Sequence, residues 1–270
     1  MLFRSNRQAI NVADRNSGSD ADNADMAAMF GFEAVDPATK TARVRGVFDS
    51  VASRYDLMND LMSAGMHRLW KRMAVELLDL RPRQRVLDLA AGTADLTALI
   101  AARGIEDLEL YTSDINRAML EAGRDKLLNQ GRVAGVRFVQ ANAETLPFAT
   151  SSLHRVIIGF GLRNVTTKQA ALNEMSRVLV PGGKVIILEF STPRSGAFAA
   201  AYDRYSFEIL PRLGQWVAGD GDSYRYLAES IRVHPDQEAL SRMMQQADLG
   251  LVHHHNLIRG AVAIHVGRKP

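Results

Sequence analysis

The chain has 270 residues, of which 47% are apolar and 23% charged, and its net charge is +3. These values are typical of a globular protein with one well-buried core, and the charge is too weakly basic to indicate nucleic-acid binding. There is no cysteine, which excludes disulfides, thiol nucleophiles and thiolate metal sites. No apolar run approaches the roughly 18 residues of a spanning helix, and the first residues lack the apolar core of a secretory signal. We therefore expect a cytoplasmic protein.

The predicted elements begin after a polar segment. Residues 1–40 show little periodicity, so we interpret them as a disordered tail. Apolar residues then recur at three- and four-residue spacing, which predicts a helical cover over 41–80, with a second helix from Met66 to Leu78. Strands and helices alternate beyond it. Strands are predicted at 85–90, 108–113, 136–141, 153–159 and 184–190, and helices at 95–103, 116–130, 168–179, 197–210, 222–231 and 236–247.

The C-terminal pattern differs from this alternation. Residues 249–256 and 261–267 are predicted to be two strands of a hairpin joined at Arg259-Gly260. Alternation followed by a hairpin indicates an α/β, Rossmann-like fold with a mostly parallel sheet and an antiparallel edge strand. Pro181-Gly182-Gly183 is predicted to be a turn, and Asp95, Asn116 and Thr167 are predicted N-caps.

Acidic residues stand at the ends of two consecutive strands. Asp88 precedes a small-residue turn that contains Gly92 and Thr93, and Asp114 ends the next strand, 22 residues after Gly92. An acidic residue at about this spacing can accept both hydroxyls of a ribose. Gly92 suits a backbone that passes close to a ligand, Thr93 offers a hydroxyl and an amide, and Asp88 can hold either the loop or a ligand's ammonium group.

The third strand is followed by polar residues of the same kind. Asn142 can hydrogen-bond an adenine edge, and Ala143 can pack against the base or offer its amide. The alternative is structural, since a single Gly-Thr turn is a weak signal and Asp114 can simply cap the next helix. The three strand ends together favour nucleoside binding. Positions 90–95 hold one glycine and there is no phosphate loop, which argues against a nicotinamide oxidoreductase.

Asp88, Gly92, Asp114 and the Asn-Ala-Glu-x-Leu-Pro-Phe stretch at 142–148 together resemble class I methyltransferases that use S-adenosylmethionine. Four longer segments resemble the UbiE family of ubiquinone/menaquinone biosynthesis C-methyltransferases. These segments are Tyr55–Trp70, Phe160–Val165, Arg177–Ser191 and Asp222–Asp236. Ala91 and Ala94 depart from the usual glycine-rich loop of class I methyltransferases, and Gly159 and Val180 depart from the UbiE pattern.

The resemblance implies a seven-stranded sheet with a reversed last hairpin, in a domain over 41–270. Its parts would be a helical cover at 41–80, a cofactor-binding half at 81–195, and a substrate lid with the hairpin at 196–270. It implies methyl transfer from S-adenosylmethionine to a ring carbon of a polyprenylated quinol, either demethylmenaquinol or 2-polyprenyl-6-methoxy-1,4-benzoquinol, with no metal. The cofactor contacts that it implies fall on Thr93, Asp114, Asn142, Ala143 and Gly159.

A quinol carbon becomes nucleophilic when a neighbouring hydroxyl loses its proton, so the site needs a proton acceptor. Arg163 and Asn164 follow the fourth strand at the open end of the sheet, and we hypothesise that they stabilise the phenolate or orient a water. A guanidinium stays protonated and is a poor direct base. Tyr55, Asp56 and His67 are alternatives, although a structural role is the stronger interpretation for His67.

Two further segments leave interpretations open. Seven large apolar residues over 198–216 suit either transient contact with the inner face of a membrane or burial as a lid over the pocket. His253-His254-His255 invites a metal interpretation, but alternate strand residues face opposite sides, so we expect a strand surface. A homodimer or a quinone-biosynthesis complex is compatible with the resemblance. Alternative functions are methylation of another small apolar acceptor and a non-catalytic scaffold.

Overall fold

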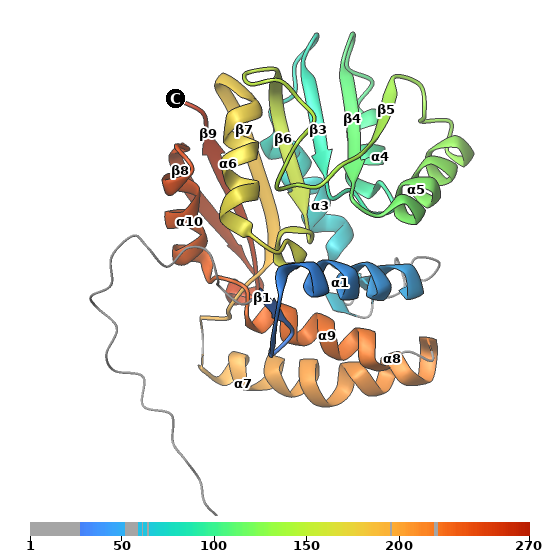
Figure 1. Ribbon diagram of the computed structural model, residues 1–270, viewed down its shortest axis with the longest axis vertical. Coiled ribbons are helices and arrows are strands. Elements are labelled where there is room, and N and C mark those ends of the chain that lie inside the picture. Colours follow the sequence, from blue (N-terminus) through green and yellow to red (C-terminus); the bar gives the residue numbers. More distant parts are fainter. Residues whose placement is uncertain (1–27, 52–58, 61, 64, 195, 219–220) are drawn as a thin grey trace, which may run out of the picture.

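The computed structural model describes residues 28–51, 59–60, 62–63, 65–194, 196–218 and 221–270. A seven-stranded sheet with the order β5-β4-β3-β6-β7-β9-β8 forms its centre (Figure 1). The pairs from β5 to β7 are parallel, whereas β9 runs antiparallel to both β7 and β8, as the sequence predicts. The strands of this sheet are β3 Arg85–Leu89, β4 Glu109–Asp114, β5 Val136–Gln140, β6 Leu153–Gly159, β7 Leu179–Phe190, β8 Gly250–Leu257 and β9 Val262–Arg268.

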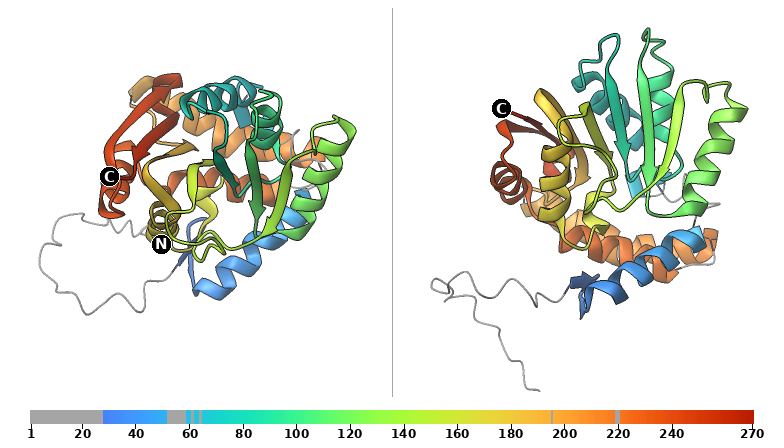
Figure 2. Two further views of the ribbon diagram at one scale, coloured as in Figure 1. Left: turned by 90° about the horizontal axis from the view of Figure 1, so that it is seen from above. Right: turned by 45° about the horizontal axis from the view of Figure 1, so that its top comes forward.

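Helices cover both faces of the sheet and its carboxyl end (Figures 1 and 2). One face carries α3 His67–Leu77, α4 Asp95–Ala101 and α5 Arg117–Asn129, and the other carries α6 Lys168–Val178 and α10 Gln237–Gln246. Across the carboxyl ends of the strands lie α1 Pro37–Val51, α9 Gly221–Arg232 and a continuous rod. The rod consists of α7 Gly196–Arg204, the π-helical turn η3 Tyr205–Ile209 and α8 Leu210–Ala218. Short 3₁₀ turns occur at η2 Leu162–Asn164 and η4 Ile258–Gly260.

The central strands bury both of their faces. Successive side chains of a strand point to opposite sides, so an apolar run is divided between two cores. In β6, Ile157 belongs to the core under α3 and α4, whereas Val156 and Ile158 belong to the core under α6 and α10. All three side chains are fully buried. This division explains why successive residues of β6 are apolar, instead of apolar and polar residues alternating along the strand.

β7 is longer than the sequence predicts. It begins at Leu179, which pairs with Leu153, and the next pair joins Lys184 to Arg155. Pro181-Gly182-Gly183 therefore lies inside the strand as an irregularity and not as a turn before it. Gly182 has a φ of +75°, a conformation that glycine adopts without steric cost.

The predicted tail is too long. β1 Ala28–Phe30 pairs antiparallel with β2 Glu33–Val35, and α1 begins at Pro37. The Phe30 ring stacks on Tyr226 of α9 with 4.3 Å between ring centroids, which gives the hairpin an apolar contact. Because Tyr226 is far away in the chain, the local sequence around Phe30 does not predict this contact. Residues 28–35 thus form a hairpin and residues 37–40 the start of α1, whereas residues 1–27 lie outside the described part.

The rod over the carboxyl ends also runs further than the prediction of a helix over 197–210. Proline normally ends a helix because it lacks an N–H. Here the N–H of Leu210 donates to the carbonyl of Tyr205, five residues earlier, so a π-turn stands directly before Pro211. The helix passes through this irregular turn and continues as α8 to Ala218.

The predicted N-caps have different outcomes. The Asn116 side chain accepts from the N–H of Met119 and caps α5. Thr167 occupies the N-cap position of α6, but its side chain makes no capping bond. The prediction for Asp95 is wrong, because Ala94 occupies that position with a φ of +62°.

Asp95 instead binds two lysines and joins three helices. Its carboxylate oxygens lie 2.5 Å from Nζ of Lys71 in α3 and 2.6 Å from Nζ of Lys126 in α5. Burial by itself would raise the pKa of Asp95, but the two ammonium groups outweigh it and hold the pKa at about 2. A group whose pKa falls on folding stabilises the folded state while it is ionised.

We expect Asp95→Asn to lower the free energy of unfolding at pH 7 by about 2–3 kcal/mol. The unfolded carboxyl has a pKa near 3.8, so this stabilisation is complete above that pH and disappears as the pH falls toward about 2. Urea denaturation of both proteins at several pH values measures the difference. Asp125→Asn, at an exposed ion pair, is the matched control. A difference between Asp95→Asn and wild type that does not shrink below pH 4 would contradict this assignment.

Candidate active site

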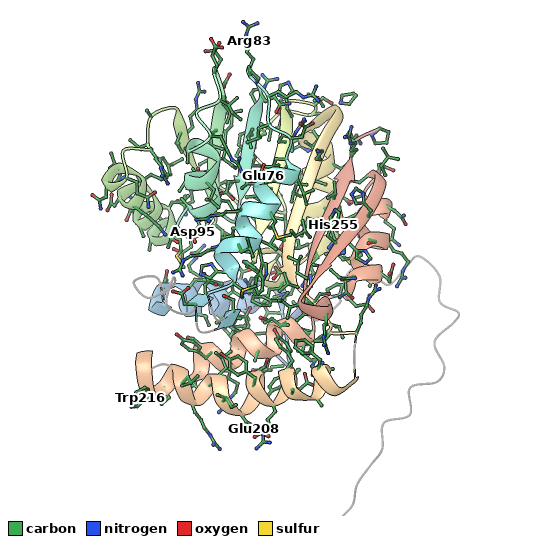
Figure 3. The ribbon with its side chains drawn as sticks, turned by 180° about the vertical axis from the view of Figure 1, so that it is seen from behind. Glu76, Arg83, Asp95, Glu208, Trp216 and His255 are labelled. Atoms are coloured by element: carbon green, nitrogen blue, oxygen red, sulfur yellow. The ribbon has the colours of Figure 1, made fainter. Side chains whose placement is uncertain are left out.

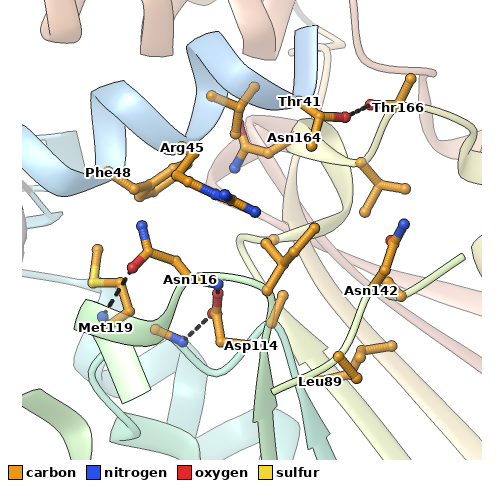
Figure 4. A pocket seen from close by; sticks show the side chains of 18 of the residues that line it. Thr41, Arg45, Phe48, Leu89, Asp114, Asn116, Met119, Asn142, Asn164 and Thr166 are labelled. Atoms are coloured by element: carbon orange, nitrogen blue, oxygen red, sulfur yellow. Dashed lines mark hydrogen bonds between the residues drawn. The ribbon is translucent and has the colours of Figure 1, made fainter. Parts of the chain in front are cut away.

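A pocket lies between α1 and the carboxyl ends of β3, β4, β5 and β6 (Figure 4). Its volume, including the open mouth, is about 810 Å³. Of the residues proposed from the sequence to contact a cofactor or substrate, the pocket wall brings together Gly92, Asp114, Asn142, Ala143 and Asn164. The position at a row of strand ends follows the general rule for ligands of open α/β sheets.

Asp114 is the acidic group at the floor of the pocket. One carboxylate oxygen accepts the N–H of Gly92 at 2.8 Å and the other accepts the N–H of Asn116 at 2.8 Å. Burial raises the pKa of Asp114, while the backbone N–H groups that it accepts act in the opposite direction. The carboxylate is thereby held in one orientation by backbone, and each oxygen keeps acceptor capacity for a ligand hydroxyl.

The stretch after β5 forms a second polar wall. Oδ1 of Asn142 accepts the N–H of Glu144 at 3.0 Å, which closes a tight turn. Oε1 of Glu144 accepts the N–H groups of Thr166 and Thr167 at 3.1 and 3.0 Å and ties this wall to the loop after η2. The Nδ2 group of Asn142 is not used in the turn, so it suits recognition of a base edge.

Helix α1 contributes a wall that the sequence analysis missed. Its pocket-lining residues are Thr41, Val44, Arg45 and Phe48. The sequence predicts a helical cover and offers Tyr55, Asp56 and His67 from it as site residues, but none of the residues of α1, because an amphipathic pattern shows which face is buried and not what it faces. The spacing of 41, 44, 45 and 48, all on one helix face, is the signal that could have found it.

Three of the residues predicted to contact the cofactor stand behind the pocket wall. Asp88 accepts hydrogen bonds from the N–H and the hydroxyl of Thr97 with Oδ2, at 2.9 and 2.7 Å, so it binds the first turn of α4. Burial raises the pKa of Asp88 to about 7. Thr93 is buried next to Gly92 but does not line the pocket. A Cβ on Gly159 would lie 2.8 Å from Leu96, so Gly159 permits close packing.

Arg163 is also behind the wall, which corrects the expectation that it points into the open end of the sheet. Its side chain is fully buried, and its Nη1 group donates to Glu189 at 2.7 Å and to the carbonyl of Phe160 at 2.5 Å. Its backbone N–H donates to the same Glu189 carboxylate at 3.1 Å. The pair thus fixes η2 against β7, directly behind the pocket.

Asn164, the neighbour of Arg163, does line the pocket. Its Oδ1 accepts the hydroxyl of Tyr226 at 3.1 Å, which leaves the amide nitrogen as a donor on the pocket side. Tyr226 and Tyr224 are buried in α9, so both pack in the core beside the site.

The other residues considered from the sequence lie elsewhere. Tyr55 and Asp56 fall outside the described residues. His67 is buried and its ring nitrogen lies 2.9 Å from Asp60, which is a structural contact. His253 and His255 share one side of β8, and the described residues contain no cluster that could hold a metal ion.

Comparison with known proteins identifies the family. The model of the ubiE/COQ5 methyltransferase family matches residues 37–269. The chain belongs to this family. Within it, the chain is 51% identical to "Ubiquinone/menaquinone biosynthesis C-methyltransferase UbiE" of Teredinibacter turnerae and 55% identical to that of Klebsiella pneumoniae. Each match covers 89% of this chain and 96% of the relative.

Solved structures share the fold of this ubiE/COQ5 family member. A methyltransferase from Thermotoga maritima superposes with a TM-score of 0.58 at 18% identity, over 84% of this chain and 100% of that one. A methyltransferase from Aquifex aeolicus superposes with a TM-score of 0.55 at 12% identity, over 78% and 95%. The Rossmann-like fold with a seven-stranded sheet is thereby confirmed.

The buried Arg163–Glu189 pair gives a stability prediction for this ubiE/COQ5 family member. We expect Arg163→Ala to lower the free energy of unfolding by about 3–5 kcal/mol, because Glu189 would be left buried without its partner. Arg81→Ala, which breaks an exposed pair with Asp79, should cost less than about 1 kcal/mol. Urea denaturation measures both values. Unchanged stability of Arg163→Ala would show that the pair is not structural.

Proposed function

We propose that this chain transfers a methyl group from S-adenosylmethionine to a ring carbon of a polyprenylated quinol. The acceptor is demethylmenaquinol, 2-polyprenyl-6-methoxy-1,4-benzoquinol, or both. The observation that carries the proposal is the position of Asp114 at the end of β4, on the floor of a pocket closed by α1. The relatives at 51–55% identity, named for ubiquinone/menaquinone biosynthesis C-methylation, support the choice of acceptor.

The pocket residues suit S-adenosylmethionine in their chemistry. Asp114 would accept the ribose hydroxyls, because its carboxylate is already oriented by two backbone N–H groups. Asn142 and Ala143 would contact the adenine, and apolar side chains such as Phe48 and Met119 offer surfaces for the flat base. Gly92 lets the backbone come close to the ligand. Thr93 and Gly159 would then support the loop from behind.

When bound, S-adenosylmethionine supplies an electrophilic methyl group on a sulfonium. The chain's own task is to hold the acceptor ring carbon in line with that methyl and to exclude water. The methyl group would pass to the ring carbon as S-adenosylhomocysteine leaves with the electrons of the broken sulfur–methyl bond, and the ring carbon would then release its proton to water. Asn164 lines the pocket and would donate from its amide nitrogen to a phenolate oxygen of the acceptor, while Arg163 would position it through η2. Tyr55 stays a proposed alternative.

We also propose that the polyprenyl tail reaches the site from a membrane surface. Trp216 on α8 is 85% exposed, and Figure 3 shows it on the outer side of the helical layer below the sheet. Ile209 and Phe207 are exposed on the same rod. Leu210, by contrast, is buried in the core, so the rod also packs inward against the rest of the fold. No described helix is long and apolar enough to cross a bilayer. A homodimer or a quinone-biosynthesis complex is a further part of this proposal.

Mass spectrometry tests the reaction directly. The purified protein is incubated with methyl-deuterated S-adenosylmethionine and with reduced short-chain demethylmenaquinone or demethyl-benzoquinone. We expect the label on a ring carbon of at least one acceptor. Binding of S-adenosylmethionine without any labelled product would leave the fold assignment intact and favour another small apolar acceptor or a scaffold role.

The proposed ribose contact gives a second prediction. We expect Asp114→Asn to weaken binding of S-adenosylmethionine by about 10- to 100-fold, because an amide can no longer accept on both of its ends. Isothermal titration calorimetry measures the dissociation constant. Asp107→Asn is the matched control and should bind like wild type, because Asp107 lies in the exposed loop that precedes β4. Equal affinities of Asp114→Asn and the control would remove Asp114 from the site.

A further inference from the structure

Among the described residues that line the pocket, one side chain is cationic, that of Arg45. The ionisable groups of the described wall are Arg45, Asp114 and Glu144. Both carboxylates already accept pairs of backbone N–H groups, from Gly92 and Asn116 in one case and from the loop after η2 in the other. Arg45 therefore supplies the positive charge of the described wall, and that charge is available to a ligand.

The position of Arg45 is fixed by the residues one turn before and after it. Positions 41, 45 and 49 lie on the same face of α1 because they are four residues apart. The Thr41 hydroxyl lies 3.2 Å from that of Thr166, and Oδ1 of Asp49 accepts Nδ2 of Asn116 at 2.7 Å. Both flanking residues are thus bonded to the strand side of the pocket. The face between them, which includes Arg45, must look across the hollow.

A third contact strengthens this attachment. Nζ of Lys40, which is buried, donates to the carbonyl of Val165 at 3.0 Å, next to Asn164 in the pocket wall. Figure 4 shows the Arg45 side chain extending from α1 into the hollow, toward the side chains on the strand side. Within the described part of the chain, Arg45 forms no ion pair. Its neighbour Arg43, in contrast, pairs with Glu33 at 2.6 Å outside the pocket.

A second donor points toward the same space. Because Oδ1 of Asn164 accepts the Tyr226 hydroxyl, the amide nitrogen of Asn164 is directed to the pocket side (Figure 4). Of these two donors, the amide of Asn164 suits the phenolate oxygen of the acceptor, as proposed above, and the guanidinium of Arg45 suits a planar carboxylate, which matches the fork of an arginine best.

We propose that Arg45 binds the carboxylate at the amino-acid end of S-adenosylmethionine. This rests on the proposed function and assigns a residue to a part of the co-substrate that Asp114 and Asn142 leave unrecognised. S-Adenosylmethionine carries one carboxylate, one ammonium and one sulfonium group. Its carboxylate is the one negatively charged group, and the Arg45 guanidinium is the one positively charged group of the described wall. Arg45 is thereby a determinant of specificity for the complete amino-acid end.

The test compares two ligands that differ only in this carboxylate. S-Adenosylmethionine and decarboxylated S-adenosylmethionine are titrated into wild type, Arg45→Gln and Arg43→Gln, and the dissociation constants are measured by calorimetry. We expect Arg45→Gln to weaken binding of S-adenosylmethionine about tenfold, the usual effect of losing a charge-assisted hydrogen bond. Its affinity for the decarboxylated ligand should stay at the wild-type value. Arg43→Gln removes the same charge from the same helix and should bind both ligands like wild type.

The other results overturn the proposal in distinguishable ways. Equal weakening for both ligands would place Arg45 against the adenosine part, and unchanged affinity for both would exclude it from the site. A wild-type protein that binds the two ligands equally well would show that the carboxylate is not recognised. If wild type shows a cooperative urea transition but binds neither ligand, the proposed function itself fails.

Discussion

The carboxylate of Asp114 is the contact on which the site depends. It joins the loop after β3, through Gly92, to the start of α5, through Asn116. Asn116 in turn caps α5 with its side-chain oxygen and donates from its amide nitrogen to Asp49 of α1. One acidic residue at a strand end therefore connects the floor of the pocket with its cover. A carboxylate held by backbone N–H groups keeps its orientation before a ligand arrives, which reduces the cost of binding.

Charged groups elsewhere in the interior have a different purpose. Arg163 and Glu189 neutralise each other behind the pocket, and Asp95 draws three helices together through Lys71 and Lys126. Burying an ion costs free energy unless a partner and further hydrogen bonds offset it. These groups are accordingly paired and keep the strand ends in place, while Asp114 and Arg45 keep capacity for a ligand. The distinction between a structural and a binding charge is made by the partners, and not by the residue type.

Much of the fold could be predicted from local patterns. The alternation of strands and helices from 85 to 247 and the final hairpin match the structure, apart from a longer β7 and a helical rod that continues to Ala218, since periodicity of two or 3.6 reflects which faces are buried. The predictions failed where a distant contact decides the outcome. Phe30 is ordered by Tyr226, Pro211 is tolerated by the π-turn before it, and Asp95 is recruited by two lysines instead of capping α4.

For the site, the sequence by itself determined the positions that follow strand ends. Gly92, Asp114 and Asn142 come directly after apolar runs, and parallel strands bring their carboxyl ends to one edge, so their meeting follows from connectivity. Only the tertiary structure decided which polar residues face the pocket. Asp88 and Arg163 turn inward to Thr97 and Glu189, whereas Arg45 enters from a helix outside the sheet. A side chain's direction depends on the partners that folding places around it, and these come from segments far apart in the chain.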